Sequence, residues 1–169
     1  MNRPQPEEYA AYQKAYIDCV PDDNILDILN RQSDEFARFF AAIPPEKQDF
    51  AYAAGKWTVK EVLGHISDTE RVFAYRALRI GRGDQTPLPG FEQDPYVEQA
   101  GFSGRSMDEL IAEFRAVRAA SLFLFENFRE AQWQNMGTAS DRPVSVRTCA
   151  YVIAGHPLHH IHLLNERYL

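Results

Sequence analysis

Apolar side chains recur at helical spacing in four blocks of this 169-residue chain, and almost no stretch alternates with period two. The first block covers about residues 24–43 and stops at Pro44-Pro45, which cannot continue a helix. The others cover about residues 58–80, 106–128 and 145–168. Long amphipathic helices in this order predict an all-α fold, a four-helix bundle formed by one domain over residues 1–169.

Two of the predicted helices have clear start signals. Thr58 and Glu61 form a capping box, and Ser106 and Glu109 form another. A short helix at about residues 7–17 is expected to precede the first long one.

Residues 81–105 form a long loop between the second and third predicted helices, rich in Gly and Pro. Loops of this length inside compact domains are usually functional or mobile. We predict that it packs across the mouth of the bundle near the histidines, with Phe91, Tyr96 or Phe102 lining a pocket. A plain crossover connection is the alternative.

Charge and composition exclude several classes of protein. A formal net charge of −6 argues against nucleic acid as a partner, because phosphate binding needs a clustered basic surface. No apolar run is long enough for a membrane-spanning helix, and the first residues lack the apolar core of a signal peptide. Two cysteines, Cys19 and Cys149, suggest a cytoplasmic protein without disulfides. We expect a small-molecule substrate and keep a homodimer open.

Four of the five histidines fall within the last fourteen residues. At about 100° per residue, His156 and His160 lie one turn apart in the middle of the apolar stripe of the last helix. His159 falls on the flank of that stripe, and His162 on the outer side. Pro157 should kink the helix just after His156.

The fifth histidine, His65, faces the core side of the second predicted helix. Each ring alone is compatible with a core imidazole bonded to a carbonyl group. Three neutral imidazoles on apolar faces would, however, each need a partner, and one shared cation satisfies all three. Three protein ligands also leave a coordination position open, as in catalytic sites. The pattern therefore predicts a metal site formed by His65, His156 and His160.

Other polar groups near these rings are weaker candidates. Glu61 and Asp68 flank His65 and could orient ligand N–H groups or act as a base, although a capping or solvated role is the simpler interpretation. His159 could bond a substrate or stay at a helix interface. Cys149 faces inward without an accompanying base, which favours a buried structural thiol.

The chain resembles the DinB/YfiT-like superfamily of metalloenzymes. The resemblance lies in the segment Trp57-Thr58-Val59-Lys60-Glu61-Val62-Leu63-Gly64-His65, the aromatic central loop, and the terminal Gly155-His156-Pro157-Leu158-His159-His160. It implies a four-helix bundle with a divalent ion, zinc or nickel, bound by His65, His156 and His160. Proline after the first terminal histidine departs from the usual pattern.

The resemblance also implies a class of chemistry. Some members are S-transferases that join low-molecular-weight thiols, such as bacillithiol or mycothiol, to electrophiles, and one branch includes a thiol-dependent maleylpyruvate isomerase. We therefore expect a metal-dependent transferase with a low-molecular-weight thiol as co-substrate. A hydrolase that uses metal-bound water and a non-catalytic metal-binding bundle are the alternatives.

Overall fold

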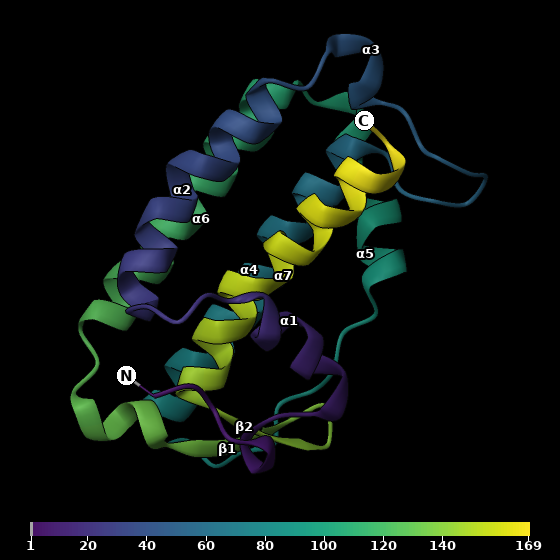
Figure 1. Ribbon diagram of the computed structural model, residues 1–169. Helices are drawn as coiled ribbons and strands as arrows, with labels where there is room; N and C mark the ends of the chain where they lie inside the picture. The colour runs from purple at the N-terminus through teal and green to yellow at the C-terminus, as the bar shows by residue number, and fades with distance from the viewer. Residues whose placement is uncertain (1) are drawn as a thin grey trace.

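Four long helices form the bundle that the sequence predicts. The computed structural model describes residues 2–169, and the long helices are α2 (Ile25–Ala41), α4 (Val59–Gly81), α6 (Met107–Glu126) and α7 (Val146–Arg167). Helix α4 packs against both α6 and α7, and α2 packs against α6 (Figure 1). No helix in the described part of the chain combines the length and the apolar character needed to cross a membrane.

Short elements connect and cover the bundle. They are η1 (Pro6–Glu8), η2 (Ala11–Gln13), α1 (Lys14–Cys19), α3 (Pro45–Gln48), α5 (Gln93–Ala100), η3 (Phe102–Gly104) and η4 (Glu130–Gln134). The predicted N-terminal helix is therefore divided into two 3-10 turns and the short helix α1. The stretch 81–105 is not a plain loop, since α5 and η3 occupy its second half. In Figure 1, α1 lies in front of α7, and α5 runs beside the bundle.

A small β-hairpin departs from the predicted all-α pattern. Strands β1 (Met136–Ala139) and β2 (Arg142–Ser145) pair antiparallel just before α7. The turn residues Ser140 and Asp141 both have positive φ, of 53° and 58°. This matches the left-handed pair that two-residue hairpin turns require. Ser-Asp lacks the usual glycine, and four-residue strands are too short to show period-two alternation.

Both predicted capping boxes are present. The Thr58 hydroxyl accepts from the Glu61 amide at 3.2 Å, and the Glu61 carboxylate accepts from the Thr58 amide at 2.7 Å. Ser106 and Glu109 make the same reciprocal pair. These bonds satisfy amide groups that have no partner within the helix, so they fix where α4 and α6 begin.

The apolar interior divides into two clusters, one near each end of the bundle. Several buried polar side chains are also present, among them a fully buried arginine, Arg118 of α6. Its guanidinium donates to the Glu70 carboxylate at 2.9 Å and to the backbone oxygens of Leu29 and Ile153 at 3.0 and 3.4 Å. Gln32 completes the network, accepting from Arg118 and donating to a backbone oxygen of α7. One side chain of α6 thus bonds to all three of the other long helices.

This network also explains how α7 accommodates Pro157. Helix α7 is continuous through Pro157, so the predicted kink does not interrupt it. Proline has no amide hydrogen, which leaves the Ile153 oxygen without its partner from within the helix. Arg118 donates to that oxygen, and Gln32 donates to the next one, of Ala154, at 3.0 Å. The backbone groups near the proline are therefore bonded by side chains of α2 and α6.

We expect Glu70→Gln to lower the free energy of unfolding by about 3–5 kcal/mol, because it leaves the Arg118 charge buried without a counter-ion. Urea denaturation would measure the loss. Asp34→Asn, which removes the exposed ion pair of Arg115 and Asp34, is the matched control and should cost less than about 1 kcal/mol. If both substitutions lower the free energy of unfolding by the same small amount, the buried pair stabilises the fold no more than the exposed one.

Candidate metal centre

Three histidine side chains meet where α4 and α7 pack together. The Nε2 of His156 lies 3.0 Å from the Nε2 of His65 and 2.9 Å from the Nε2 of His160. One ring nitrogen from each of the three lies within 4.8 Å of those of the other two. His65 and His156 are 91 positions apart in the sequence. Packing of α4 against α7 is therefore what creates the cluster.

The spacing of the nitrogens suits a common cation. Nitrogens that each lie about 2.1 Å from one ion are about 3.0–3.4 Å apart for bond angles near 90–110°. The two short separations are at or just below this range. His156 and His160 reach the same point because they are one helical turn apart, as the angular argument predicts. The group could therefore accept a divalent ion after a small adjustment of the rings.

Burial keeps these imidazoles uncharged. It lowers the pKa of His65 from the ordinary 6.5 to about 4. Burial, with the neighbouring histidines adding to it, lowers the pKa of His160 to about 3 and places that of His156 well below its ordinary value. At neutral pH all three rings thus have a free nitrogen lone pair, the state that metal binding requires.

Aromatic rings surround the cluster. The Trp57 ring lies 4.6 Å from that of His65, and Tyr16 of α1 meets His156 edge-on at 5.2 Å between centroids. Tyr16 comes close because α7 has a glycine at 155, where a Cβ would lie 1.9 Å from the Tyr16 backbone oxygen. Tight packing of the N-terminal segment on α7 thus supplies one wall of the site, which the sequence analysis did not foresee.

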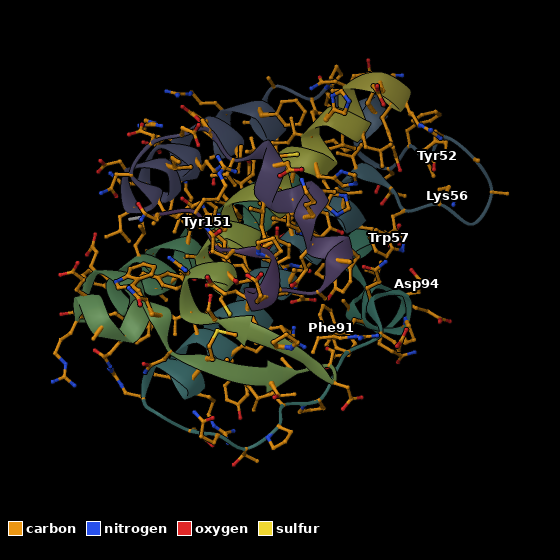
Figure 2. All side chains as sticks on the ribbon, turned by 60° about the horizontal axis from the view of Figure 1, so that its bottom comes forward. Tyr52, Lys56, Trp57, Phe91, Asp94 and Tyr151 are labelled. Atoms are coloured by element: carbon orange, nitrogen blue, oxygen red, sulfur yellow. The ribbon has the colours of Figure 1, made fainter. Side chains whose placement is uncertain are left out.

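A cavity of about 360 Å³ adjoins the histidines. Its walls come from the N-terminal segment, α4, the segment before and at the start of α5, the hairpin turn and α7. The lining residues are Tyr12, Tyr16, His65, Thr69, Phe73, Arg76, Phe91, Glu92, Gln93, Asp94, Ser140, Val152 and His156. Figure 2 shows Asp94 on α5 and Phe91 near that helix, on the side of the molecule where Trp57 also lies.

The three aromatic residues of the stretch 81–105 that were predicted to line the pocket lie in different places. Phe91 lines the cavity, so part of the stretch 81–105 does lie at the histidines. Tyr96 packs on Phe91 at 5.4 Å but does not reach the cavity. Phe102 is buried in the core, with its ring filling the space that a side chain at Gly64 would need. Of the three aromatic residues predicted as alternatives for the lining of the pocket, Phe91 alone lines it.

The weaker candidates lie around the cluster without joining it. The Glu61 carboxylate is bonded to the Thr58 amide in its capping box, and Asp68 pairs with Arg71 at 3.1 Å. His159 packs edge-on against Tyr16 at 5.4 Å, next to the cluster. The Nδ1 of His160 is buried and has no hydrogen-bond partner among the described residues.

The remaining two predictions concern Cys149 and His162. Cys149 is fully buried, which raises the pKa of its thiol to about 12. Such a thiol stays protonated at neutral pH, as expected of a structural residue. The His162 side chain is mostly exposed and lies 3.3 Å from Glu166, on the outer side of α7 as the angular argument predicts.

One polar cavity residue was missed although the sequence contains a signal for it. Thr69 and Arg76 follow His65 by four and eleven positions, which at about 100° per residue places both within about 40° of it on α4. Thr69 is thus predicted on the face of His65 together with its apolar neighbours, and Arg76 is the residue of this face that was not recognised. The contributions of Tyr12 and Tyr16 could not have been found this way, since they depend on where the N-terminal segment docks.

We expect the metal-free protein to lose stability as the pH falls from about 6.5 to about 4. Above that range the rings are uncharged in both states; within it the unfolded chain binds protons that the folded protein cannot. Each buried ring should contribute a slope of about 1.4 kcal/mol per pH unit. Urea denaturation with chelator present, between about pH 6.5 and 5, measures this before most carboxylates titrate.

The matched variants are His65→Leu, which should reduce the slope by roughly one proton, and His162→Gln, which should leave it unchanged because its ring is exposed. A wild-type slope no steeper than that of His65→Leu would contradict the burial of an uncharged ring at position 65.

Solved structures of similar fold support this architecture. YfiT from Bacillus subtilis, described as a probable metal-dependent hydrolase with an unusual four-helix bundle topology, has a TM-score of 0.75 at 14% identity, covering 98% of this chain and 90% of its own. A mycothiol-dependent maleylpyruvate isomerase has a TM-score of 0.67 at 16% identity. That match covers 85% of this chain but 60% of the isomerase. At these identities the likeness shows the fold alone.

No protein of curated function matches the chain. The model of the DinB superfamily, however, matches residues 28–164, which include α4, most of α7 and all three clustered histidines. The fold, the histidine cluster and this match agree, and the chain belongs to the DinB superfamily.

Proposed function

We propose that this protein is a divalent-metal-dependent enzyme that transfers a low-molecular-weight thiol to an electrophilic small molecule. His65, His156 and His160 would bind the ion through imidazole nitrogens, a donor set that suits zinc or nickel. The observation that carries the proposal is the convergence of three uncharged histidine nitrogens, with the rings of His65 and His156 in the wall of a cavity. A structural ion would need no such cavity, whereas a catalytic one needs an open position beside it.

When bound, a divalent ion would supply Lewis acidity, which holds a thiol as thiolate near neutral pH. The chain's own residues would do the rest. The three imidazoles would hold the ion beside the cavity. Phe73, Phe91 and Val152 supply the apolar part of the cavity lining. No catalytic base is assigned, because Glu61 is bonded to the helix cap and Asp68 to Arg71.

The nucleophile would come from outside the protein. Burial keeps the Cys149 thiol protonated, and Cys19 lies on the exposed surface of α1 rather than in the cavity. An external thiol is in keeping with the mycothiol dependence of the isomerase of similar fold.

Hydrolysis is the second candidate, favoured by the description of YfiT as a probable metal-dependent hydrolase. The same three ligands would serve it, because a bound ion can lower the pKa of water to about 7. The two reactions differ in whether an added thiol is required.

We expect the purified protein to bind one equivalent of Zn²⁺ or Ni²⁺, and His65→Ala, His156→Ala and His160→Ala each to bind the ion at least about 10-fold more weakly, because each loses one of three ligands. Calorimetry and elemental analysis would measure affinity and stoichiometry. His162→Ala is the matched control, a histidine of the same helix whose ring is exposed. Full occupancy in His65→Ala would reject this ligand set.

We further expect conjugation of a thiol to a model electrophile to require both the ion and the added thiol, and to disappear in His160→Ala. The thiol should react with an apparent pKa well below the free value of about 8.5, because the ion favours the thiolate. A chromogenic electrophile followed over pH measures this. Ester hydrolysis at full rate without thiol would instead establish the hydrolase.

A further inference from the structure

The cavity beside the histidines ends in a buried positive charge. Arg76 of α4 is 4% exposed and lines the cavity together with His65 and His156. Its guanidinium carbon lies 4.9 Å from the centre of the Phe73 ring. Burial lowers the pKa of this guanidinium, yet arginine stays protonated in proteins at neutral pH. The cavity thus contains a permanent cation on its protein wall.

No counter-ion for Arg76 is present in the part of the chain that the structure describes. Its Nη2 donates to the Pro89 oxygen at 3.0 Å and to the Ser140 hydroxyl at 3.1 Å, both neutral acceptors. No carboxylate oxygen of residues 2–169 lies within 4.0 Å of it. The contrast with Arg118 is direct, since that buried arginine is paired with Glu70. Buried charges are normally paired, so Arg76 lacks a partner that a ligand could supply.

A second polar group on the same wall also lacks a partner. Thr69 is 4% exposed, lines the cavity, and its Oγ1 has no hydrogen-bond partner among the described residues. It lies between His65 and Arg76 on one face of α4. A molecule extending from the histidines to Arg76 would pass this hydroxyl.

We propose that the cavity binds a small molecule bearing a carboxylate, which pairs with Arg76 while the other end of the molecule meets the histidines. The guanidinium fork matches a carboxylate, and Nη2 is already positioned by Pro89 and Ser140. The inference deepens the proposed function and rests on it for the end at the histidines. It adds a substrate class: acids are favoured over neutral molecules of the same length.

Geometry sets the size of that molecule. Eleven residues of helix separate the α-carbons of His65 and Arg76 by about 16 Å. Both side chains lean toward the N-terminus, and the gap between their ends is shorter because the Arg76 side chain is the longer of the two. A cavity of about 360 Å³ accommodates a short chain with two functional ends. Two carboxylates, Glu92 and Asp94, also line it, but both side chains are exposed and neither contacts Arg76.

The test separates the two ends of the molecule. Hexanoate and hexanol are titrated into metal-free protein by NMR, which probes Arg76 without any metal. Mercaptohexanoate and mercaptohexanol are then titrated into Co²⁺-loaded protein, where a thiolate-to-cobalt absorption band reports the histidine end. We expect each acid to bind about 10- to 100-fold more tightly than its alcohol, the value of a hydrogen-bonded charge pair.

Arg76→Met and Arg76→Gln should abolish this preference for the acid while keeping the cobalt band. Arg82→Met is the matched control, an exposed arginine at the end of the same helix that does not line the cavity, and it should keep the preference. Circular dichroism verifies that the variants fold. Should both variants unfold, the comparison of acid and alcohol binding by the wild-type protein still tests whether the cavity prefers a carboxylate.

Equal binding of hexanoate and hexanol by the wild-type protein would overturn the anion site, and an ion pair between Arg76 and Asp94 in solution would give that result. If the wild-type protein prefers the acid but gives no thiolate-to-cobalt band with either mercapto compound, the proposed thiol chemistry is rejected while the carboxylate site is supported.

Discussion

The arrangement of the four long helices depends on one buried guanidinium. Arg118 bonds to Leu29 and Gln32 of α2, Glu70 of α4 and Ile153 of α7. A charge in this position is costly unless every donor is satisfied, so the network accepts little variation in how the helices are placed. Apolar side chains alone would allow the helices to slide and rotate at smaller cost.

The same network connects the bundle to the histidines. The oxygen of Ile153 has no hydrogen bond within the helix, because Pro157 follows it by four residues and has no amide hydrogen. His156 directly precedes that proline. By bonding to Ile153, Arg118 keeps α7 continuous where the helix would otherwise be weakest. His156 and His160 lie on either side of Pro157, so the one-turn relation of the two rings depends on that continuity.

Helix α4 has polar roles on more than one face, which is unusual for a helix so deeply buried. Glu70 faces the network around Arg118, while His65, Thr69 and Arg76 face the cavity. The cavity face of α4 carries one ring of the histidine cluster, a hydroxyl without a hydrogen-bond partner and a guanidinium without a carboxylate partner among the described residues.

Much of the fold could be predicted from the sequence because its determinants are local. Apolar periodicity gives the four helices, and the capping residues Thr58 and Ser106 fix two of their starts. The proximity of His156 to His160 is also determined locally, because the two residues are one helical turn apart. The approach of His65 to that pair was inferred only from its facing the core and from the family resemblance.

What could not be predicted depends on long-range packing. Arg118 looks like any charged helix residue in the sequence, and only the tertiary structure brings Glu70 to it. The Ser140-Asp141 turn lacks the glycine that usually marks a hairpin. The sequence does not distinguish Phe102 from Phe91 as a lining residue. The Phe102 ring is buried because it packs against Gly64 of α4, a contact that only the tertiary structure creates.

The close approach of Tyr16 to Gly155 has a consequence for biosynthesis. The N-terminal segment leaves the ribosome first, yet the surface it docks on belongs to the last helix of the fold. Until α7 has been made, Tyr12 and Tyr16 have no partner, and the wall they form beside His156 cannot exist. The wall beside the histidine cluster therefore forms only after α7 has been translated, when segments from the two ends of the described chain come together.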